Sequence, residues 1–186
     1  FKAADKHTPK NEVNGFTYPF TPVITNDAPD QIQLFQWGLI PHWAKNVEIQ
    51  KSTLNAKIET ITEKPSYKDV VSHRCLIPVN GFYEWQWLNS SGTQKDKYLI
   101  TSNDAILSLA GLWNVWENKL TGEKINTYSI LTTEADELML KIHNTKKRMP
   151  VILPREHEIS WLTSTDLPII NHDLKAIKQD VLNQYS

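Results

Sequence analysis

The sequence predicts an α+β fold that is mainly β, with a mixed, strongly curved sheet or a barrel-like core and a few short helices. Segments rich in β-branched and aromatic residues recur between turn signals over most of the 186 residues, whereas helical patterns are few and short. No repeat, low-complexity tract or Gly/Ser linker divides the chain. We therefore expect one domain over residues 1–186.

The predicted strands begin with two segments of different regularity. Residues 16–24 contain three aromatic residues and two prolines, which favours an irregular or edge strand. Residues 31–40 alternate more cleanly and carry apolar residues on both sides, as in a strand covered on both faces. The further predicted strands are residues 74–79, 82–88, 97–102, 106–116 and 127–132. Residues 89–92, Asn-Ser-Ser-Gly, form a hairpin connection between two of them.

Three short helices are predicted. Thr133, followed by acidic residues, is a candidate cap for a helix that runs to Ile142. Residues 155–162 form a second helix after a proline. Asn171 is a candidate cap for a third helix over residues 173–183, in which apolar residues recur on one stripe.

Composition restricts the class of protein. Twenty Lys and Arg residues nearly balance 21 Asp and Glu residues, which excludes a globally basic nucleic-acid coat but leaves a local basic patch open. The single cysteine, Cys75, cannot form an internal disulfide, so a reducing compartment is expected. No apolar run approaches the roughly 20 residues of a membrane span. We expect a soluble, cytoplasmic protein, associated with the nucleoid if it is bacterial.

Glu84 is the first candidate for proton transfer. It lies between Tyr83 and Trp85, three residues after Gly81, and an acid in aromatic surroundings points to a functional group. A strand glutamate that faces water between inward-pointing aromatic residues is an equally strong alternative.

A second segment combines His143 with the tight basic cluster at residues 146–148. His143 stands where a predicted helix ends, and the helix dipole favours a cation there, so a structural role is a serious alternative to proton transfer. The cluster, which ends at Arg148, can bind phosphates, although adjacent basic residues on a loop are more often solvated surface.

A third segment, residues 55–60, begins with a carboxamide and a cation. Asn55 can both donate hydrogen bonds to a substrate and accept them, and Lys57 supplies a point charge for a phosphate. Most of the seven tryptophans are expected in the core, but Trp43 and Trp85 are candidate platforms for stacked nucleobases.

A cysteine nucleophile and a metal site are both weaker possibilities. Cys75 lies in an apolar predicted strand, with Ile77 and Val79 on its own side, where a cysteine behaves as a small hydrophobic residue. The six histidines have no HxxxH spacing and no CxxC motif is present, so we expect no metal and no cofactor.

Together these segments resemble the SOS-response-associated peptidase (SRAP) family, whose members shield abasic sites in single-stranded DNA. The matching runs occur in family order at residues 37–43, 55–60, 74–85, 110–113, 132–135, and 142–143 with 148–153. The resemblance implies a mixed β fold around a positively lined cleft. It also implies an N-terminal cysteine, exposed by self-removal of the initiator Met, that attacks the ring-opened aldehyde of the abasic sugar. The implied product is a stable thiazolidine crosslink.

The resemblance further implies residue roles. Asn55 would orient the sugar or the cysteine, Glu84 would act as acid and base near the N-terminal amine, and His143 would assist proton transfer in Schiff-base formation and reversal. The residues expected to contact DNA are Trp43, Trp85, Lys57 and Arg148. We expect a monomer whose partner is single-stranded DNA that contains abasic sites.

Three features depart from the family pattern. The sequence begins at Phe1, so we expect the Met-Cys start to lie outside it. Lys57 stands where Arg is usual, which keeps the charge but loses the bidentate fork. Residues 144–147 separate His143 from Arg148, more than the commonest His-x-Arg spacing.

Two other classes of function stay open from the sequence. The same cleft and aromatic platforms suit a module that binds single-stranded nucleic acid without covalent chemistry. A cysteine hydrolase that uses Cys75 with His143 is the third class, and burial of Cys75 would remove it.

Overall fold

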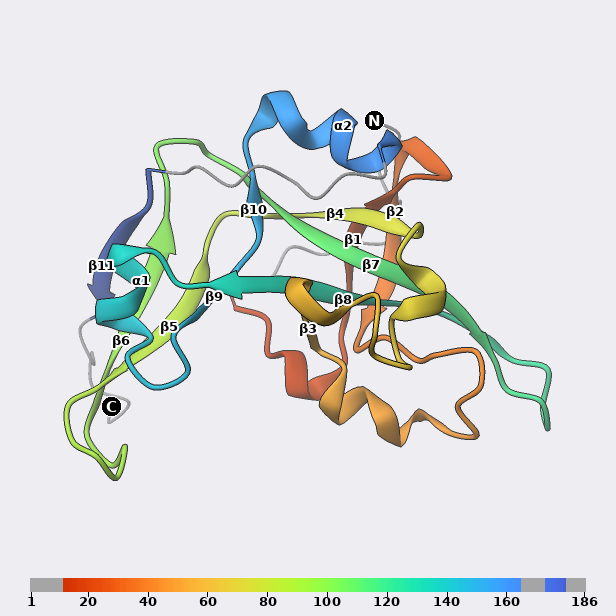
Figure 1. Cartoon of the computed structure of the whole chain (residues 1–186), viewed down its shortest axis with the longest axis horizontal. Helices are drawn as coiled ribbons and strands as arrows, with labels where there is room; N and C mark the ends of the chain where they lie inside the picture. The colour runs from red at the N-terminus through yellow and green to blue at the C-terminus, as the bar shows by residue number, and fades with distance from the viewer. Residues whose placement is uncertain (1–11, 165–172, 180–186) are drawn as a thin grey trace, which may run out of the picture.

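The computed structural model describes residues 12–164 and 173–179, which form mainly β-strands (Figure 1). The strands are β1 Phe20–Thr25, β2 Ala28–Trp37, β3 Asn55–Lys57, β4 Arg74–Val79, β5 Phe82–Trp87, β6 Lys95–Thr101, β7 Leu107–Glu117, β8 Lys124–Glu134, β9 Arg148–Pro150, β10 Ile152–Leu153 and β11 Lys175–Gln179. The α-helices are α1 Glu137–Ile142 and α2 Glu158–Thr163. The 3-10 turns are η1 Gly15–Thr17, η2 Val47–Ser52, η3 Ile58–Thr60, η4 Lys68–Val70 and η5 Arg155–His157.

Five strands close into a barrel-like ring in the order β7-β4-β1-β2-β8, because β7 also pairs with β8. The ring is mixed: its pairs are antiparallel except where the end of β2 runs parallel to β8. Strands β3 and β9 both add to the later part of β8, and β10 adds to β7. The predicted fold class, a curved and mainly β structure with a few short helices, is confirmed.

Alternate residues of the barrel strands fill two hydrophobic clusters. In β4, Leu76 belongs to one cluster, whereas Cys75 and Ile77 belong to the other. In β7, Ala110 and Leu109 divide in the same way. The first cluster continues into α2 and η4, and the second continues into α1. Both faces of the sheet are therefore covered, which explains why these strands are apolar on both sides.

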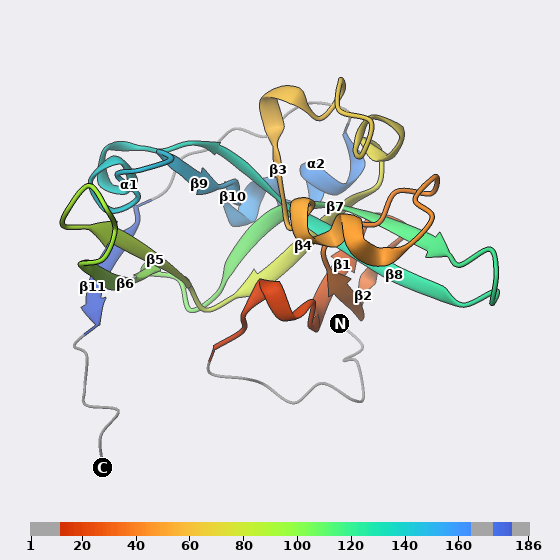
Figure 2. The ribbon, with the colours of Figure 1, turned by 90° about the horizontal axis from the view of Figure 1, so that it is seen from below.

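A second sheet, in the order β11-β6-β5, lies at one end of the molecule, and the β7–β8 hairpin projects at the other end (Figure 2). One face of this sheet, which includes Phe82, Tyr98 and Ala176, packs against the second cluster. Helix α1 contacts β5 on that side. This packing places α1 on the face of β5 that carries Phe82 and Glu84.

Gly81 allows β5 to start close to β6. A Cβ atom at this position would lie 2.5 Å from the carbonyl oxygen of Ile100 and 3.1 Å from Cδ1 of Leu99. This close approach fixes where the strand that carries Glu84 begins.

The start of the first predicted strand is wrong. Within residues 16–24, Phe16 and Thr17 belong to η1, and β1 begins only at Phe20. The Asn14 side chain accepts a hydrogen bond from the Phe16 amide, and Tyr18 has a left-handed φ of 49°. A residue in that conformation interrupts an extended segment, so the turn persists until the prolyl residue that precedes β1.

The predicted helix cap at Thr133 is also wrong. Thr133 lies in β8, which continues to Glu134 because β9 pairs with it. Helix α1 is instead capped by Asp136, whose carboxylate accepts a hydrogen bond from the Met139 amide at 2.7 Å. The predicted helix at residues 155–162 is present as η5 followed by α2.

The predicted helix over residues 173–183 is contradicted where the structure describes it. Residues 175–179 form β11, which pairs antiparallel with β6. Leu174 and Ala176 pack toward the second cluster, whereas Ile177 is exposed. The spacing from Leu174 to Ile177 imitates a helical stripe, but the free edge of β6 supplies backbone hydrogen bonds that a helix would leave unused. The candidate cap Asn171 lies outside the described residues.

We predict that Gly81→Ala lowers the free energy of unfolding by about 1–3 kcal/mol, because the new methyl group must displace the Ile100 carbonyl. Urea unfolding of both variants measures this. Asn80→Ala is the matched control and should change the free energy by less than about 0.5 kcal/mol. Equal stability of Gly81→Ala and the parent would show that β5 starts elsewhere.

Candidate functional site

Glu84 and His143 contact each other across the gap between β5 and the end of α1. Oε2 of Glu84 lies 3.3 Å from Nδ1 of His143, and the two side chains are only 19% and 18% exposed. Oε1 of Glu84 also accepts a hydrogen bond from the Trp85 amide. Glu84 is therefore not the water-facing strand glutamate that the sequence left as an alternative.

The hydrogen bonds of the His143 ring define its tautomer. Nδ1 lies 2.8 Å from the main-chain oxygen of Arg148, and a carbonyl oxygen can only accept. Nδ1 therefore carries the hydrogen, and in the neutral ring Nε2 keeps a lone pair. His143 also ends α1, since its amide donates to the Met139 oxygen. The expected structural role at a helix end and a ring nitrogen with no hydrogen-bond partner among residues 12–164 and 173–179 therefore occur in one residue.

The loop after His143 is fixed to the edge of β5. The Asn144 carboxamide accepts a hydrogen bond from the Trp87 amide and donates one to the Trp87 oxygen. The Lys147 amide donates to the His143 oxygen at 3.0 Å, and Lys147 takes a left-handed φ of 53°. This turn absorbs the extra residues between His143 and Arg148, so the two remain in contact despite the longer spacing.

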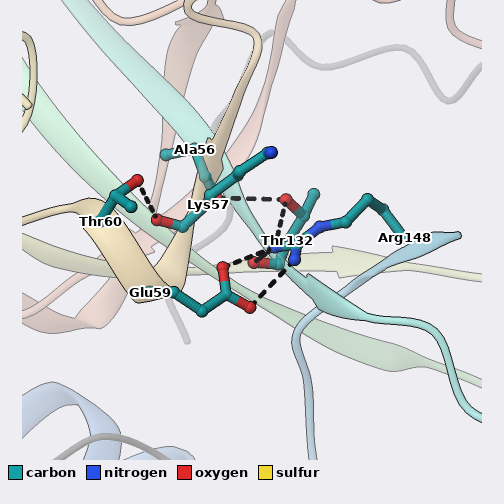
Figure 3. Close-up of polar contacts among 6 residues, drawn as sticks. All are labelled: Ala56, Lys57, Glu59, Thr60, Thr132 and Arg148. Carbon is teal, nitrogen blue, oxygen red and sulfur yellow. Dashed lines mark hydrogen bonds and ion pairs between the residues drawn. The ribbon is translucent and has the colours of Figure 1, made fainter. Parts of the chain in front are cut away.

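Arg148 is held by a carboxylate rather than left as a solvated loop cation (Figure 3). Its Nη1 and Nη2 atoms donate to the two carboxylate oxygens of Glu59 at 3.0 and 2.9 Å. Nη2 also donates to the main-chain oxygen of Thr132 at 2.6 Å. The hydrogen bond from Arg148 holds the pKa of the Glu59 carboxyl below its usual value.

Glu59 is a site residue that sequence reasoning missed. Its position in the sequence offered a signal, because it lies two residues after Lys57 within the same matching run. Its partner is 89 residues away, however, and only the folded chain brings the two together.

Asn55 and Lys57 lie on β3, next to the segment of β8 that carries Thr132. Both residues are exposed and flank the buried Ala56, so they share one face of the strand. Lys57 pairs in register with Thr132, the residue that holds Arg148. Among residues 12–164 and 173–179, no polar group lies within hydrogen-bond or ion-pair distance of the Lys57 ammonium or the Asn55 carboxamide.

The two candidate stacking residues lie apart from the Glu84–His143 contact. Trp43 is half-exposed, and its indole donates to the Pro65 oxygen. Trp85 follows Glu84 directly, so its side chain projects from the opposite face of β5. There it is 36% exposed, with the ammonium groups of Lys95 and Lys97 each 5.8 Å from the ring centroid.

The remaining chemical groups limit other mechanisms. Cys75 is completely buried, and burial raises the pKa of its thiol well above the usual value. Within the part of the chain that the structure describes, no group of three His, Cys, Asp or Glu residues is placed to hold a metal ion. None of the described helices is both long and apolar enough to cross a membrane.

Comparison with known proteins places these observations in a family. A family model described as SOS response associated peptidase (SRAP) matches residues 2–186. The chain belongs to the SRAP family. The resemblance in the sequence motifs is thereby confirmed.

Relatives of this SRAP chain carry names that concern abasic sites. Abasic site processing protein YoaM of Bacillus subtilis is 40% identical over 141 residues, which cover 75% of this chain and 60% of YoaM. Abasic site processing protein YoqW of the same species is 37% identical over 166 residues, which cover 88% of this chain and 72% of YoqW. The chain thus spans less than two thirds of YoaM.

A solved structure has the same fold as this SRAP chain. The crystal structure of a protein from Bacteroides thetaiotaomicron superimposes with a TM-score of 0.81 at 39% sequence identity. The match covers 89% of this chain and 76% of the Bacteroides protein.

We predict that the neutral His143 ring carries its hydrogen on Nδ1, because the Arg148 oxygen can only accept. Nitrogen-15 NMR of histidine-labelled protein measures this tautomer, and the His143→Gln variant assigns the signal. The exposed His42 ring in the same spectra is the reference. A His143 ring protonated on Nε2 would contradict the geometry described here.

Proposed function

We propose that the protein processes abasic sites in single-stranded DNA and captures them covalently. The names of the relatives and membership in the SRAP family support a role at abasic sites. The observation that carries the proposal is the contact between Glu84 and His143, because it places a carboxylate and a free imidazole nitrogen together beside a basic cluster.

The proposed nucleophile is an N-terminal cysteine of the full-length protein, exposed by self-removal of its initiator Met. Its amine adds to the aldehyde of the ring-opened sugar, and loss of water gives an imine. The thiol then adds across the imine, with sulfur bonded to carbon and the proton passed to nitrogen, which closes a thiazolidine ring. Nothing is oxidised or reduced in these steps.

Each step moves a proton near neutral pH, which Glu84 and His143 are suited to do. Glu84 would accept a proton from the amine as it attacks. Nε2 of His143, once it has taken up a proton, would donate that proton to the hydroxyl that leaves as water. Asn55 would orient the sugar or the cysteine with its unoccupied carboxamide, and Lys57 would contact a backbone phosphate.

A non-covalent function is the second candidate. The exposed ring of Trp85, with the Lys95 ammonium group beside it, favours binding of single-stranded nucleic acid by stacking and charge. The Lys97 ammonium lies at the same distance from the ring but is paired with Glu12. This surface can serve both functions, so only covalent capture distinguishes them.

The experiment that tests the proposal is capture of an abasic single-stranded oligonucleotide by full-length protein, followed on a denaturing gel. We expect a stable adduct with the full-length protein and none with a Cys→Ser variant at its second residue. Binding by the full-length protein without an adduct would contradict covalent capture and favour the non-covalent binding function. An adduct that survives in the Cys→Ser variant would refute the proposed nucleophile.

Two variants distinguish a loss of phosphate contact from a loss of proton transfer. We predict that Lys57→Ala weakens binding and lowers the slope of log affinity against log salt by about 0.7, the contribution of one phosphate contact. Glu84→Gln leaves that slope unchanged and slows adduct formation. Salt titrations and adduct time courses measure both effects.

Lys119→Ala is the matched control for the salt titration, because Lys119 is an exposed lysine in the turn between β7 and β8. A slope equally altered by Lys57→Ala and Lys119→Ala would show that β3 does not contact DNA.

Cys75→Ala tests the cysteine-hydrolase alternative. We predict that this variant of the full-length protein keeps its capture of abasic DNA, because the buried thiol cannot reach a substrate. The small vacancy lowers the free energy of unfolding by about 1–2 kcal/mol. Adduct yield and urea unfolding are measured on the same samples, and a folded variant that captures no DNA would restore Cys75 as a candidate nucleophile.

A further inference from the structure

The Glu59 carboxylate binds Arg148 in the geometry that a phosphate would use. Two parallel hydrogen bonds, at 3.0 and 2.9 Å, join the fork of the guanidinium to the two oxygens of the carboxylate. Arginine binds carboxylates and phosphates through the same bidentate fork. The anion that faces Arg148 in this structure therefore belongs to the protein itself.

The cationic side of this contact is anchored independently of Glu59. Nη2 of Arg148 donates to the main-chain oxygen of Thr132 at 2.6 Å and lies 3.3 Å from its hydroxyl. The Thr132 hydroxyl in turn donates to the Ala56 oxygen, which links β8 to β3. The guanidinium thus keeps its contacts with Thr132 of β8 when its carboxylate partner leaves.

The Glu59 side of the contact is held more weakly. Its side chain is 42% exposed, whereas that of Arg148 is 17% exposed. Glu59 lies on the single turn η3, which Ile58 anchors in the core, so its side chain can turn to solvent without moving the backbone. Because the Glu59 side chain is partly exposed, a strand that carries several phosphates can compete with this one carboxylate for the guanidinium.

We propose that Glu59 occupies the Arg148 guanidinium as an internal competitor until a backbone phosphate of single-stranded DNA displaces it. This proposal rests on the proposed function and adds that Glu59 competes with DNA for Arg148. Glu59 lowers the affinity for DNA in general, so tight binding depends on the further contacts that a target strand makes. Figure 3 shows the carboxylate of Glu59 and the hydroxyl of Thr132 both turned to the Arg148 guanidinium.

The test compares Glu59→Gln with Glu63→Gln, since Glu63 is an exposed glutamate four residues later and its change alters the net charge equally. The probe is a 12-nucleotide oligothymidylate without an abasic site, titrated against salt by fluorescence anisotropy. We expect Glu59→Gln to bind about two- to tenfold more tightly than the parent at low salt with an unchanged salt slope, because the phosphate contact to Arg148 forms in both proteins. Glu63→Gln should increase the affinity less and should have the same slope of log affinity against log salt as the parent.

The double variant Glu59→Gln/Arg148→Gln shows whether Glu59 acts through Arg148. If it does, the gain from Glu59→Gln disappears when Arg148 is absent. A gain that persists in the Arg148→Gln background, or one matched by Glu63→Gln, would overturn the proposal, because either result reflects net charge alone. Weaker binding by a folded Glu59→Gln variant would also overturn it, since Glu59 would then position Arg148 rather than compete for it.

A measurement on the unmodified protein does not depend on how well the variants fold. Nitrogen-15 NMR of the Arg148 guanidinium should change when the oligonucleotide is added, as its partner changes from carboxylate to phosphate. An unchanged guanidinium signal under saturating oligonucleotide would contradict displacement. Failure of the proposed function is distinguishable, because it appears as absent capture of abasic DNA by the full-length parent, whatever Glu59→Gln does.

Discussion

The hydrogen bond between the His143 ring and the main-chain oxygen of Arg148 is the interaction on which the rest of the site depends. It fixes the ring with its hydrogen on Nδ1 and holds it against Glu84. It also joins the end of α1 to β9. The side chain of Arg148 in β9 contacts Glu59, which lies on η3 directly after β3. Because β9 pairs with β8 and β8 with β3, one ladder of strands sets the spacing between the proton-transferring pair and the basic cluster.

The electrostatics of the site depend on pairing rather than on the number of basic residues. The chain is nearly neutral, and within the site Glu59 offsets the charge of Arg148. Lys57 makes no ion pair or hydrogen bond within the residues that the structure describes, but its charge contributes, after that of Arg148, to the lowered pKa of the Glu59 carboxyl. In the proposed function, a phosphate must replace the Glu59 carboxylate before it can contact Arg148.

Much of this arrangement could be predicted from the sequence, and the remainder depends on long-range contacts. The alternation of apolar residues predicted the barrel strands, and the chemistry of Glu84 and His143 marked them as candidates. The pairing of β6 with β11 overrode the helical spacing from Leu174 to Ile177, and the β8–β9 ladder moved the helix cap from Thr133 to Asp136. The pairing of Glu59 with Arg148 was not predicted, because a local sequence pattern does not indicate a partner 89 residues away.

The measurement that tests the account most directly is the identity of the residue that carries DNA after capture. Full-length protein is incubated with an abasic oligonucleotide and digested, and peptide mass spectrometry locates the nucleotide remnant. The account predicts the remnant on an N-terminal cysteine from which the initiator Met has been removed. A remnant on Cys75, on Lys57 or on any other internal side chain would contradict it.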